Sequence, residues 1–459
     1  MKLADYIRTI RNKKIVVIGI GVSNTPLIEL LLDGGCDVTA CDKSERARLG
    51  GLATRFEERG VKLRLGEDYL KELRADIIFR TPGMRPDLPE LTAAAKNGAE
   101  LTSEMEVFFD VCPSRIIAVT GSDGKTTTTS IIAELLRASG YTVHVGGNIG
   151  TPLLNQADRM HPDDFVVLEL SSFQLMTMKK SPPAAVVTNI TPNHLDMHLD
   201  MDEYVEAKRN IIRYQSPSDT VVLNFDNDIT RAFAETARGN VLLFSLKNRI
   251  KNGVYLEGET IYNASDGKTE PLLDTSRIFL PGVHNIENYM AAFAATRGLV
   301  DRTVCLKVAE TFKGVAHRIE LVRTLNGVRY YNDSIASSPT RTIAGLRSFK
   351  QKVILIAGGK DKGVPFDALG PEVIDHVKTL VLTGLTAGRL RDTVENAPGY
   401  AGNPEIIEKE DFTEAVLEAN ARAESGDIVL LSPACTSYDR FKNFEERGNT
   451  FKQLVNGLE

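Results

Sequence analysis

The chain has 459 residues, of which 42% are hydrophobic and 25% charged, and a formal net charge of −6. This length is too great for one ordinary hydrophobic core and predicts about three domains. The negative charge, without any basic run, argues against non-specific nucleic-acid binding. No apolar run approaches the roughly 20 residues of a membrane span, and residues 1–6 lack a signal-peptide core. We therefore expect a cytoplasmic protein without membrane insertion.

The first predicted element is a buried strand over residues 14–21, which ends in Gly19-x-Gly21. A helix over residues 26–33 and a strand over residues 37–42 follow, and the second strand ends in Asp42. This order is typical of a Rossmann-like unit, in which the glycines admit a diphosphate and the acid binds a ribose hydroxyl.

A further strand over residues 76–79 leads into a predicted binding loop over residues 80–84. Asn24 stands where the Rossmann pattern has its third glycine, which puts a dinucleotide site in doubt. An NAD(P)-linked oxidoreductase is the alternative function for this part of the chain. It leaves the next motif unexplained.

That motif is Gly121-Ser-Asp-Gly-Lys-Thr126, which follows a strand over residues 115–120 and opens a helix. The glycines let backbone N–H groups turn toward phosphate oxygens, and the helix offers its positive N-terminus. Lys125 can reach the β- and γ-phosphates, and the Thr126 hydroxyl can hold Mg²⁺. The loop is shorter than the common G-x-x-x-x-G-K-[ST] form, which would place a glycine at Val119. These residues predict an ATP-using enzyme or a nucleotide switch; the alternative is a glycine-rich turn with an incidental lysine.

Two more buried strands are predicted over residues 164–169 and 184–190, with helical segments between them. Such β-branched runs favour a mostly parallel sheet covered on both faces, with the ligand crevice at the carboxyl ends of its strands. Glu169 ends one strand, and together with Thr126 it offers the oxygen ligands that magnesium-ATP needs. His194 lies in the polar turn after the other strand. The alternatives are a surface or capping acid at 169 and a structural histidine at 194.

The last part of the chain contains predicted strands over residues 352–359, 379–384 and 427–432, which alternate with helices. The predicted fold is therefore α/β with three domains. These are a Rossmann-like domain (1–103), a central mononucleotide-binding ATPase domain with a parallel sheet (104–315), and a second Rossmann-like domain (316–459).

A series of further motifs follows in order along the chain: Gly147-Asn-Ile-Gly-Thr-Pro-Leu153, Glu169-Leu-Ser-Ser-Phe-Gln-Leu175, Asn189-Ile-Thr-Pro-Asn-His-Leu-Asp196, Tyr204-x-x-x-Lys208, Gly282-x-His-Asn-x-x-Asn288 and His317-Arg-x-Glu320. In order and approximate spacing the series resembles the Mur ligases, as does the compact loop G-[ST]-x-G-K-T. The tail over residues 432–448 is similar to the D-glutamate-adding members in particular. The resemblance covers essentially the whole chain.

The resemblance implies an ATP-dependent, ADP-forming ligase of peptidoglycan precursor synthesis, with UDP-N-acetylmuramoyl-L-alanine and D-glutamate as its partners. No nucleic-acid partner is expected, and we expect a monomer. Another Mur-family or folylpolyglutamate-type amino-acid ligase is the nearest alternative. A non-enzymatic ATP-binding protein is a more distant one, because it would have no reason to keep Glu169, His194 and Lys208 together.

The resemblance also implies roles for particular residues. The ATP phosphates would be held by Gly121, Ser122, Asp123, Gly124, Lys125, Thr126 and Thr127. Thr126 and Glu169 would hold a first Mg²⁺. Lys208 resembles the family's carbamylated lysine, whose CO₂ adduct would position a second Mg²⁺ with His194; its alternative is an ordinary lysine on a helix surface. Lys125, His194 and Lys208 would be the catalytic residues.

The remaining positions fall in all three predicted domains. Asn285, Asn288, Arg318 and Asp333 resemble residues that hold the adenine, γ-phosphate and ribose of ATP. The uridine nucleotide would contact Val22, Ser23, Asp42, Thr81, Gly83 and, through its muramoyl-alanine part, Asn148. D-Glutamate would contact Lys362, Ser437 and Phe444. The chain departs from the family at Ile335 and Ser337, where many D-glutamate ligases have lysine and threonine, and at Asn193, where some have aspartate.

Overall fold

The computed structural model describes residues 1–192, 197–361 and 364–459. These residues form three β-sheets, which follow one another along the chain as predicted. By their contacts they divide into two compact units. The first unit comprises Met1–Arg277 and Glu287–Val308 and contains the first two sheets; the second comprises Ile278–Ile286 and Ala309–Glu459 and contains the third. The predicted domain limits at residues 103 and 315 remain predictions.

The first sheet is parallel throughout and has the order β3-β2-β1-β4-β5. Its strands are β1 (Lys14–Ile18), β2 (Asp37–Asp42), β3 (Lys62–Leu65), β4 (Ile77–Arg80) and β5 (Glu100–Thr102). Its helices are α1 (Leu3–Ile10), α2 (Asn24–Asp33), α3 (Arg46–Leu49), α4 (Gly51–Glu58) and α5 (Pro89–Lys96). The strand order reverses at β1, so the loops after β1 and β4 border the crevice where such sheets bind ligands.

Asn24 explains how this sheet does without the third glycine of the Rossmann pattern. Its side chain is buried, and its Nδ2 donates a hydrogen bond of 2.9 Å to the Ile18 carbonyl at the end of β1. The amide therefore joins the start of α2 to the strand that precedes it. A polar side chain serves the junction that glycine usually closes by its small size.

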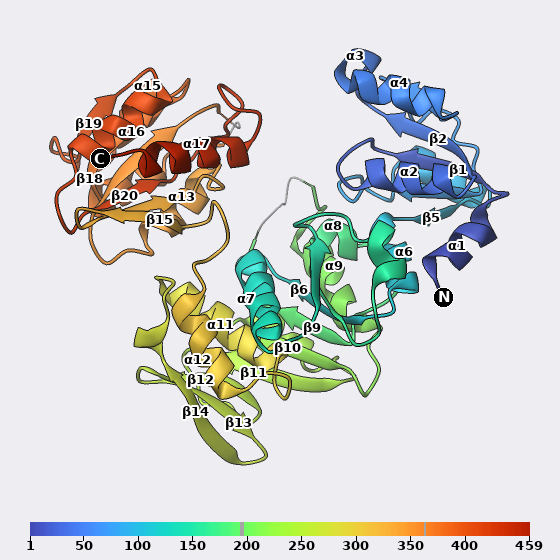
Figure 1. Ribbon diagram of the computed structural model, residues 1–459, viewed down its shortest axis with the longest axis horizontal. Helices are drawn as coiled ribbons and strands as arrows, with labels where there is room; N and C mark the ends of the chain where they lie inside the picture. The colour runs from blue at the N-terminus through green and yellow to red at the C-terminus, as the bar shows by residue number, and fades with distance from the viewer. Residues whose placement is uncertain (193–196, 362–363) are drawn as a thin grey trace. The chain divides into compact units, whose positions relative to one another are not determined.

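The second sheet has the order β14-β13-β12-β11-β10-β9-β6-β8-β7 and lies in the same unit (Figure 1). Its strands are β6 (Arg115–Thr120), β7 (Val143–Gly147), β8 (Phe165–Glu169), β9 (Ala184–Val187), β10 (Thr220–Asn224), β11 (Asn240–Ser245), β12 (Gly253–Glu257), β13 (Thr260–Ser265) and β14 (Lys268–Asp274). The pairs from β7 to β12 are parallel, as predicted, whereas β12, β13 and β14 pair antiparallel.

Helices and 3₁₀ turns connect these strands. They are α6 (Glu104–Val111), α7 (Lys125–Ala138), η1 (Leu154–Arg159), α8 (Ser172–Leu175), α9 (Met201–Arg213), α10 (Asp228–Phe233) and η2 (Thr275–Arg277). Two later helices, α11 (Val283–Ala295) and α12 (Arg302–Thr311), have residues in both compact units. No helix of the described residues is long and apolar enough to cross a membrane.

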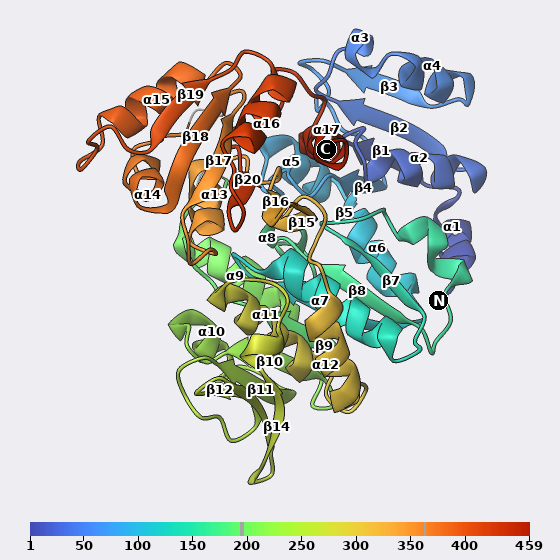
Figure 2. The ribbon, with the colours of Figure 1, turned by 60° about the vertical axis from the view of Figure 1, so that its left-hand side comes forward.

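The third sheet has the order β15-β16-β20-β17-β18-β19 and is parallel except for the pair β15–β16 (Figure 2). Its strands are β15 (Glu320–Leu325), β16 (Val328–Asn332), β17 (Val353–Gly358), β18 (Val377–Thr383), β19 (Glu405–Glu408) and β20 (Ile428–Leu431). Its helices are α13 (Pro339–Leu346), α14 (Leu369–His376), α15 (Ala387–Glu395), α16 (Phe412–Ala421) and α17 (Phe444–Asn456). The three predicted strands correspond to β17, β18 and β20.

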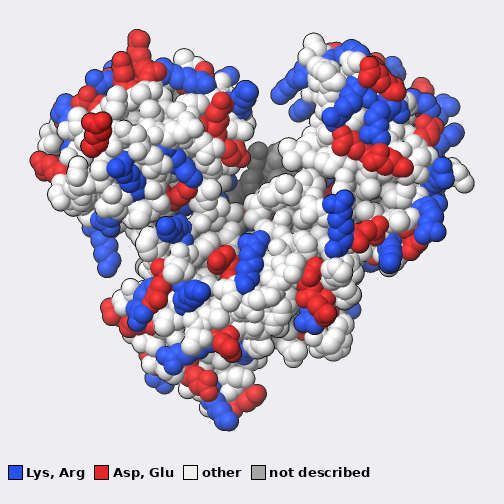
Figure 3. Space-filling view, in the orientation of Figure 1, with Lys and Arg blue, Asp and Glu red and all other residues white. Residues whose placement is uncertain are grey.

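Alternate residues of the central strands in this sheet enter two separate cores. Leu355 of β17 packs in the core that α13, α14 and α15 cover, and Ile354 and Ile356 pack in the core that α16 and α17 cover. This alternation follows from the two-residue period of a strand, and it accounts for the continuous apolar run that the sequence shows. On the face that Figure 3 draws, basic and acidic side chains are interspersed.

The core between this sheet and α17 provides a test of the fold. Phe451 of α17 is fully buried, so Phe451→Ala should cost about 3–5 kcal/mol through lost burial and a residual cavity. Leu417→Ala on α16 is the matched control, because that side chain is 48% exposed and its loss should change stability by less than about 0.5 kcal/mol. Urea unfolding of the full chain, followed by circular dichroism, measures both; equal losses would contradict this packing.

Candidate active site

The phosphate loop connects β6 to α7 and lies against the end of β9. Gly121 has a φ of +146° and Gly124 a φ of +77°, conformations that residues with a side chain rarely adopt. A Cβ at Gly121 would overlap Thr188 Oγ1, and one at Gly124 would overlap Asn288 Oδ1. The two glycines of the motif are therefore needed both for the backbone conformation and for the close approach of neighbouring side chains.

Hydrogen bonds from the loop to the segment after β9 hold its backbone. The Ser122 N–H donates to the Asn189 carbonyl at 2.8 Å, and the Asp123 N–H donates to Asn189 Oδ1 at 3.0 Å. Thr188 Oγ1 donates to the Asp123 carbonyl at 2.6 Å. The loop is thus fixed on one side before α7 begins at Lys125. Lys125 Nζ donates to the Ser122 carbonyl at 2.9 Å, so its charge lies over the loop.

Thr126 and Glu169 form a buried pair beside this loop. Thr126 Oγ1 donates to Glu169 Oε2 at 2.6 Å, and Asn148 Nδ2 donates to Glu169 Oε1 at 2.8 Å. The pair forms because β8 lies between β6 and β7 in the sheet, so that the ends of all three strands meet. Glu169 is buried and is therefore no surface acid. A hydroxyl and a carboxylate at one point are donors that fit Mg²⁺.

Lys208 reaches the same loop from α9. Its Nζ donates to the Gly121 carbonyl at 2.7 Å and lies 4.7 Å from the centroid of the Tyr204 ring. Only 2% of the residue is exposed, so the alternative of a helix-surface lysine is wrong. Burial, followed by the positive charge of Lys125, holds the pKa of the Lys208 amine well below its ordinary value. This position therefore favours a neutral amine at the phosphate loop.

The predicted second metal set cannot be followed completely, because His194 and Asn193 lie outside the described residues. Among the residues that the structure does describe, no group of three His, Cys, Asp or Glu side chains could hold a metal. Apart from His194, the predicted ligands include only one residue of those four types, Glu169; the others are the Thr126 hydroxyl and the modified Lys208. Thr126 and Glu169 are in direct contact, and Lys208 approaches the same loop.

A cavity of about 280 Å³ lies between the loops of the first and second sheets. It brings together three predicted uridine-nucleotide contacts, Val22, Ser23 and Asn148. Its other lining residues are Pro82, from the predicted binding loop over residues 80–84, and Gly147, Gly150, Pro152 and Gln174, to which the sequence analysis gave no role. These last four lie within the motifs that begin at Gly147 and Glu169. Membership of these segments could therefore have predicted that they line a substrate cavity.

The other predicted uridine-nucleotide residues, Asp42, Thr81 and Gly83, do not line this cavity. Asp42 accepts hydrogen bonds from the backbone N–H groups of Ile20, at 2.6 Å, and Ser44, at 2.7 Å. Its carboxylate therefore shapes the loop after β1. Thr81 lies so close to Gly19 that a Cβ there would be 3.0 Å from the Thr81 Cβ. Gly83 follows in the loop after β4, two residues before Arg85.

The predicted ATP residues divide between the two units. In the first unit, Asn288 Oδ1 accepts a hydrogen bond of 3.1 Å from Thr128 Oγ1, beside Gly124. In the second unit, Asn285 Nδ2 donates to the Pro281 carbonyl at 2.6 Å. Also in the second unit, Arg318 has its Nε buried with no hydrogen-bond partner among the described residues.

Asp333 is the most deeply buried acid of the second unit. Ser432 Oγ donates to its Oδ2 at 2.8 Å, and the Ile319 N–H donates to its Oδ1 at 3.3 Å. Burial raises the pKa of the Asp333 carboxyl to about 7, although both hydrogen bonds and the charge of Arg318 oppose this rise. The carboxyl group is therefore protonated in part near neutral pH.

Two of the three predicted D-glutamate residues can be placed. Ser437 is buried, and Phe444, which begins α17, lies edge-on to the His317 ring with the centroids 6.0 Å apart. Lys362 lies outside the described residues. Ile335, which stands where many relatives have lysine, donates its backbone N–H to the His317 carbonyl at 3.1 Å. This stretch is thus held by its backbone, whatever side chain it carries.

Comparison with known proteins agrees with a chain that contains three sheets and a phosphate loop in the second of them. The family model described as the Mur ligase middle domain matches residues 119–296, and that described as the Mur ligase, glutamate ligase domain matches residues 317–435. Relatives of 50–56% identity cover almost the entire chain. The chain belongs to the Mur ligase family and is an ATP-dependent, ADP-forming amide ligase.

Two relatives carry a more specific name. The UDP-N-acetylmuramoylalanine–D-glutamate ligase of Acetivibrio thermocellus is 56% identical over 464 residues, which cover 100% of this chain and 99% of the relative. The ligase of the same name from Ruminiclostridium cellulolyticum is 53% identical over 462 residues, with 100% and 99% coverage.

Solved structures show the same fold at low sequence identity. The UDP-N-acetylmuramate-alanine ligase from Thermotoga maritima has a TM-score of 0.61 and 19% identity, and the match covers 97% of this chain and 99% of that one. The MurF ligase from the same organism, in complex with ADP, has a TM-score of 0.56 and 18% identity, with 96% and 95% coverage.

The raised pKa of Asp333 predicts a particular pH dependence of stability. A folded-state pKa above the unfolded value means that the free energy of unfolding decreases as pH rises from about 4 to about 7. Asp333→Asn removes this ionisation, so its stability relative to wild type should increase over that interval and then level off. Urea unfolding of the nucleotide-free chain at several pH values measures this. The exposed Asp375→Asn is the control and should show no such trend; a parallel trend in both variants would contradict the assignment.

Proposed function

We propose that this enzyme joins D-glutamate to the alanyl carboxylate of UDP-N-acetylmuramoyl-L-alanine, with conversion of ATP to ADP and phosphate. The observation that supports this substrate pair is the identity of 50–56%, over almost the whole chain, with ligases of that name. The reaction would be a cytoplasmic step of peptidoglycan precursor synthesis, carried out by a monomer. The tail over residues 432–448 supports D-glutamate as the amino acid.

The chemistry begins with a carboxylate that does not react with amines. Attack of the alanyl carboxylate on the γ-phosphate of ATP forms an acyl phosphate and releases ADP. The amino group of D-glutamate then attacks the acyl carbon, and the tetrahedral intermediate expels phosphate to leave the amide. No protein nucleophile is required, so positioning and charge stabilisation are the tasks of the protein.

The phosphate loop has the features that these tasks require. Backbone N–H groups of Gly121–Thr127 and the N-terminus of α7 would bind the phosphates, and Lys125 would neutralise charge on the γ-phosphoryl group. Asn285, Asn288, Arg318 and Asp333 would hold the rest of ATP. Asn288 belongs to the first compact unit, and the other three residues belong to the second.

Thr126 and Glu169 would hold a first Mg²⁺, and His194 and Lys208 would position a second. When bound, Mg²⁺ supplies positive charge to the phosphate oxygens. The hydrogen bond of 2.6 Å between Thr126 and Glu169 supports the first assignment, because it brings the two oxygen donors to one point. These residues would hold the ion against the loop that binds the phosphates.

The environment of Lys208 supports its carbamylation. An unprotonated amine attacks CO₂ and loses a proton, which yields a carbamate with one negative charge. The low pKa of the Lys208 amine favours the reactive form, and burial beside the phosphate loop shields the product from solvent. The modification would replace a cation by an anion where a metal is to be held.

The first sheet would bind the uridine nucleotide rather than NAD. Val22, Ser23 and Asn148 line one cavity, which joins the crevice of the first sheet to the strand ends of the second. Asp42, Thr81 and Gly83, which do not line it, would also contact the nucleotide. This arrangement would hold the uridine diphosphate in the first sheet and direct the muramoyl-alanine part toward Glu169, while D-glutamate would contact Lys362, Ser437 and Phe444.

The substrate assignment predicts that phosphate release from ATP requires both partners. Purified enzyme with UDP-N-acetylmuramoyl-L-alanine should release phosphate at a high rate with D-glutamate and at a rate about 10²-fold lower or less with L-glutamate, L-alanine or lysine, because a misplaced amine cannot attack the acyl phosphate. A coupled phosphate assay measures this. Equal rates with another amino acid would leave only the family and exclude D-glutamate as the substrate.

The role of Lys208 predicts chemical rescue. Lys208→Ala should lower kcat by about 10²-fold or more, and acetate should restore part of the activity by supplying carboxylate oxygens near the loop. Lys208→Arg should not recover, because a guanidinium keeps its positive charge. With labelled bicarbonate, the wild-type enzyme should show a carbamate signal by NMR, and Lys208→Ala should show none. Unchanged activity in both variants, or an identical signal, would contradict the carbamate.

A further inference from the structure

Two arginines, Arg80 and Arg85, connect the loop after β4 to the helices of the second sheet, one at each end of the loop. Arg80 is almost fully buried, and its Nη2 donates to Thr177 Oγ1, just after α8, at 2.6 Å. Its Nη1 donates to the Met84 carbonyl at 2.8 Å and the Pro82 carbonyl at 3.2 Å. One guanidinium therefore closes the loop over residues 81–84 and joins it to the neighbouring α8 region.

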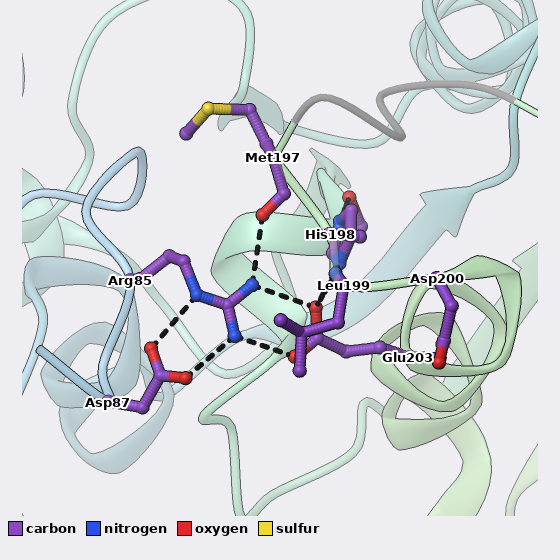
Figure 4. Close-up of polar contacts among 8 residues, drawn as sticks. Arg85, Asp87, Met197, His198, Leu199, Asp200 and Glu203 are labelled. Carbon is purple, nitrogen blue, oxygen red and sulfur yellow. Dashed lines mark hydrogen bonds and ion pairs between the residues drawn. The ribbon is translucent and has the colours of Figure 1, made fainter.

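Arg85 makes the second connection, to the first turn of α9 (Figure 4). Its Nη1 and Nη2 each lie 2.9 Å from a carboxylate oxygen of Glu203, a two-point contact of the kind that fixes orientation. Its Nη1 also donates to the Met197 carbonyl at 3.0 Å. The same guanidinium forms a second two-point contact with Asp87, at 2.8 and 2.9 Å, within its own loop.

Glu203 connects Arg85 to the residues that immediately precede α9. Besides Arg85, it accepts the Leu199 N–H at 2.8 Å, and its Oε2 lies 3.3 Å from His198 Nδ1. Hydrogen bonding from Arg85 lowers the pKa of the Glu203 carboxyl to about 2, so it is an anion throughout the physiological range. The side chain of His198 is fully buried; its Nε2 is 2.9 Å from Ser172 Oγ and its ring is stacked on Phe173.

The next residues of α9 touch the phosphate loop. Tyr204 packs edge-on against His198, and its hydroxyl forms a hydrogen bond of 2.9 Å with Ser122 Oγ. Lys208, one turn further, contacts the Gly121 carbonyl. Direct contacts therefore run from Arg85 to Glu203, from Glu203 through His198 to Tyr204, and from Tyr204 to Ser122 of the phosphate loop.

We propose that Arg85 and Glu203 are positioning residues for the ligase reaction. Their contact sets the loop over residues 81–84 against α9, so that the carboxylate of the bound uridine nucleotide meets the γ-phosphate held by the phosphate loop. This inference rests on the proposed function. Neither residue touches a reacting atom, and their effect is one of alignment, in which a displacement of about 1 Å can cost about 10²-fold in rate.

Arg85 offers a matched pair of variants, because it binds two carboxylates: Glu203, which belongs to α9, and Asp87, which belongs to its own loop. Glu203→Gln weakens the contact to α9 and keeps an oxygen for the Leu199 N–H, whereas Asp87→Asn weakens a contact confined to the loop. With D-glutamate present, Glu203→Gln should lower kcat about tenfold or more, and Asp87→Asn should change it less than about twofold. By calorimetry, both variants should bind UDP alone and magnesium-ADP alone with wild-type dissociation constants. UDP would contact only the side of the loop after β4, and magnesium-ADP only the side of the phosphate loop, so neither needs the Arg85–Glu203 contact.

Each outcome decides the inference. Equal kcat values for Glu203→Gln and Asp87→Asn, with an active wild type, overturn it, and so does a loss of UDP affinity that equals the loss of kcat/KM. An inactive wild type with D-glutamate rejects the proposed substrate instead, which is a separate result. If Glu203→Gln does not fold, Arg85→Gln breaks the same contact from the loop after β4, outside the helices. The double variant Arg85→Gln/Glu203→Gln should be no slower than the slower single variant, because both remove one interaction; additive losses overturn the inference.

Discussion

The close approach of the phosphate loop to the end of β9 is the constraint on which the active site depends. Gly121 passes Thr188 and Asn189 with no room for a side chain, and the backbone of the loop is hydrogen-bonded to both. Because these contacts hold the loop, α7 begins at Lys125 beside the end of β9, and Thr126 meets Glu169 at the adjacent strand end. Packing between neighbouring strands thus determines where the predicted phosphate-binding groups point.

Around this loop the protein buries charged groups that would cost stability if they had no partners. Glu169 is held by a hydroxyl and an amide, and Lys208 by a backbone carbonyl and an aromatic face. Exclusion of water strengthens the interactions of these groups with a charged ligand. The same burial lowers the pKa of the Lys208 amine and so favours its neutral form.

The sequence predicted those strands that can be recognised from the pattern of their own residues. β1, β6, β8 and β17 are apolar runs of strand length followed by glycine or a polar residue, and each was placed correctly from that pattern. The antiparallel strands β12–β14 were not predicted, because β14 has four exposed residues in a row and no apolar run. Lys208 lies between Glu206 and Arg209 in sequence, which is typical of a surface, and only the rotation of α9 against the phosphate loop shows that it is buried.

The sequence by itself determined the phosphate loop, the succession of three α/β sheets and the family, since each depends on residues that are close together or on motifs in a set order. The tertiary structure decided which distant residues meet. Glu169 faces Thr126 because β8 pairs with β6, and Arg85 meets Glu203, 118 residues later, because the crevice of the first sheet opens toward α9. Such contacts depend on strand order and helix packing, which arise from burial of the whole chain and leave no local pattern in the residues concerned.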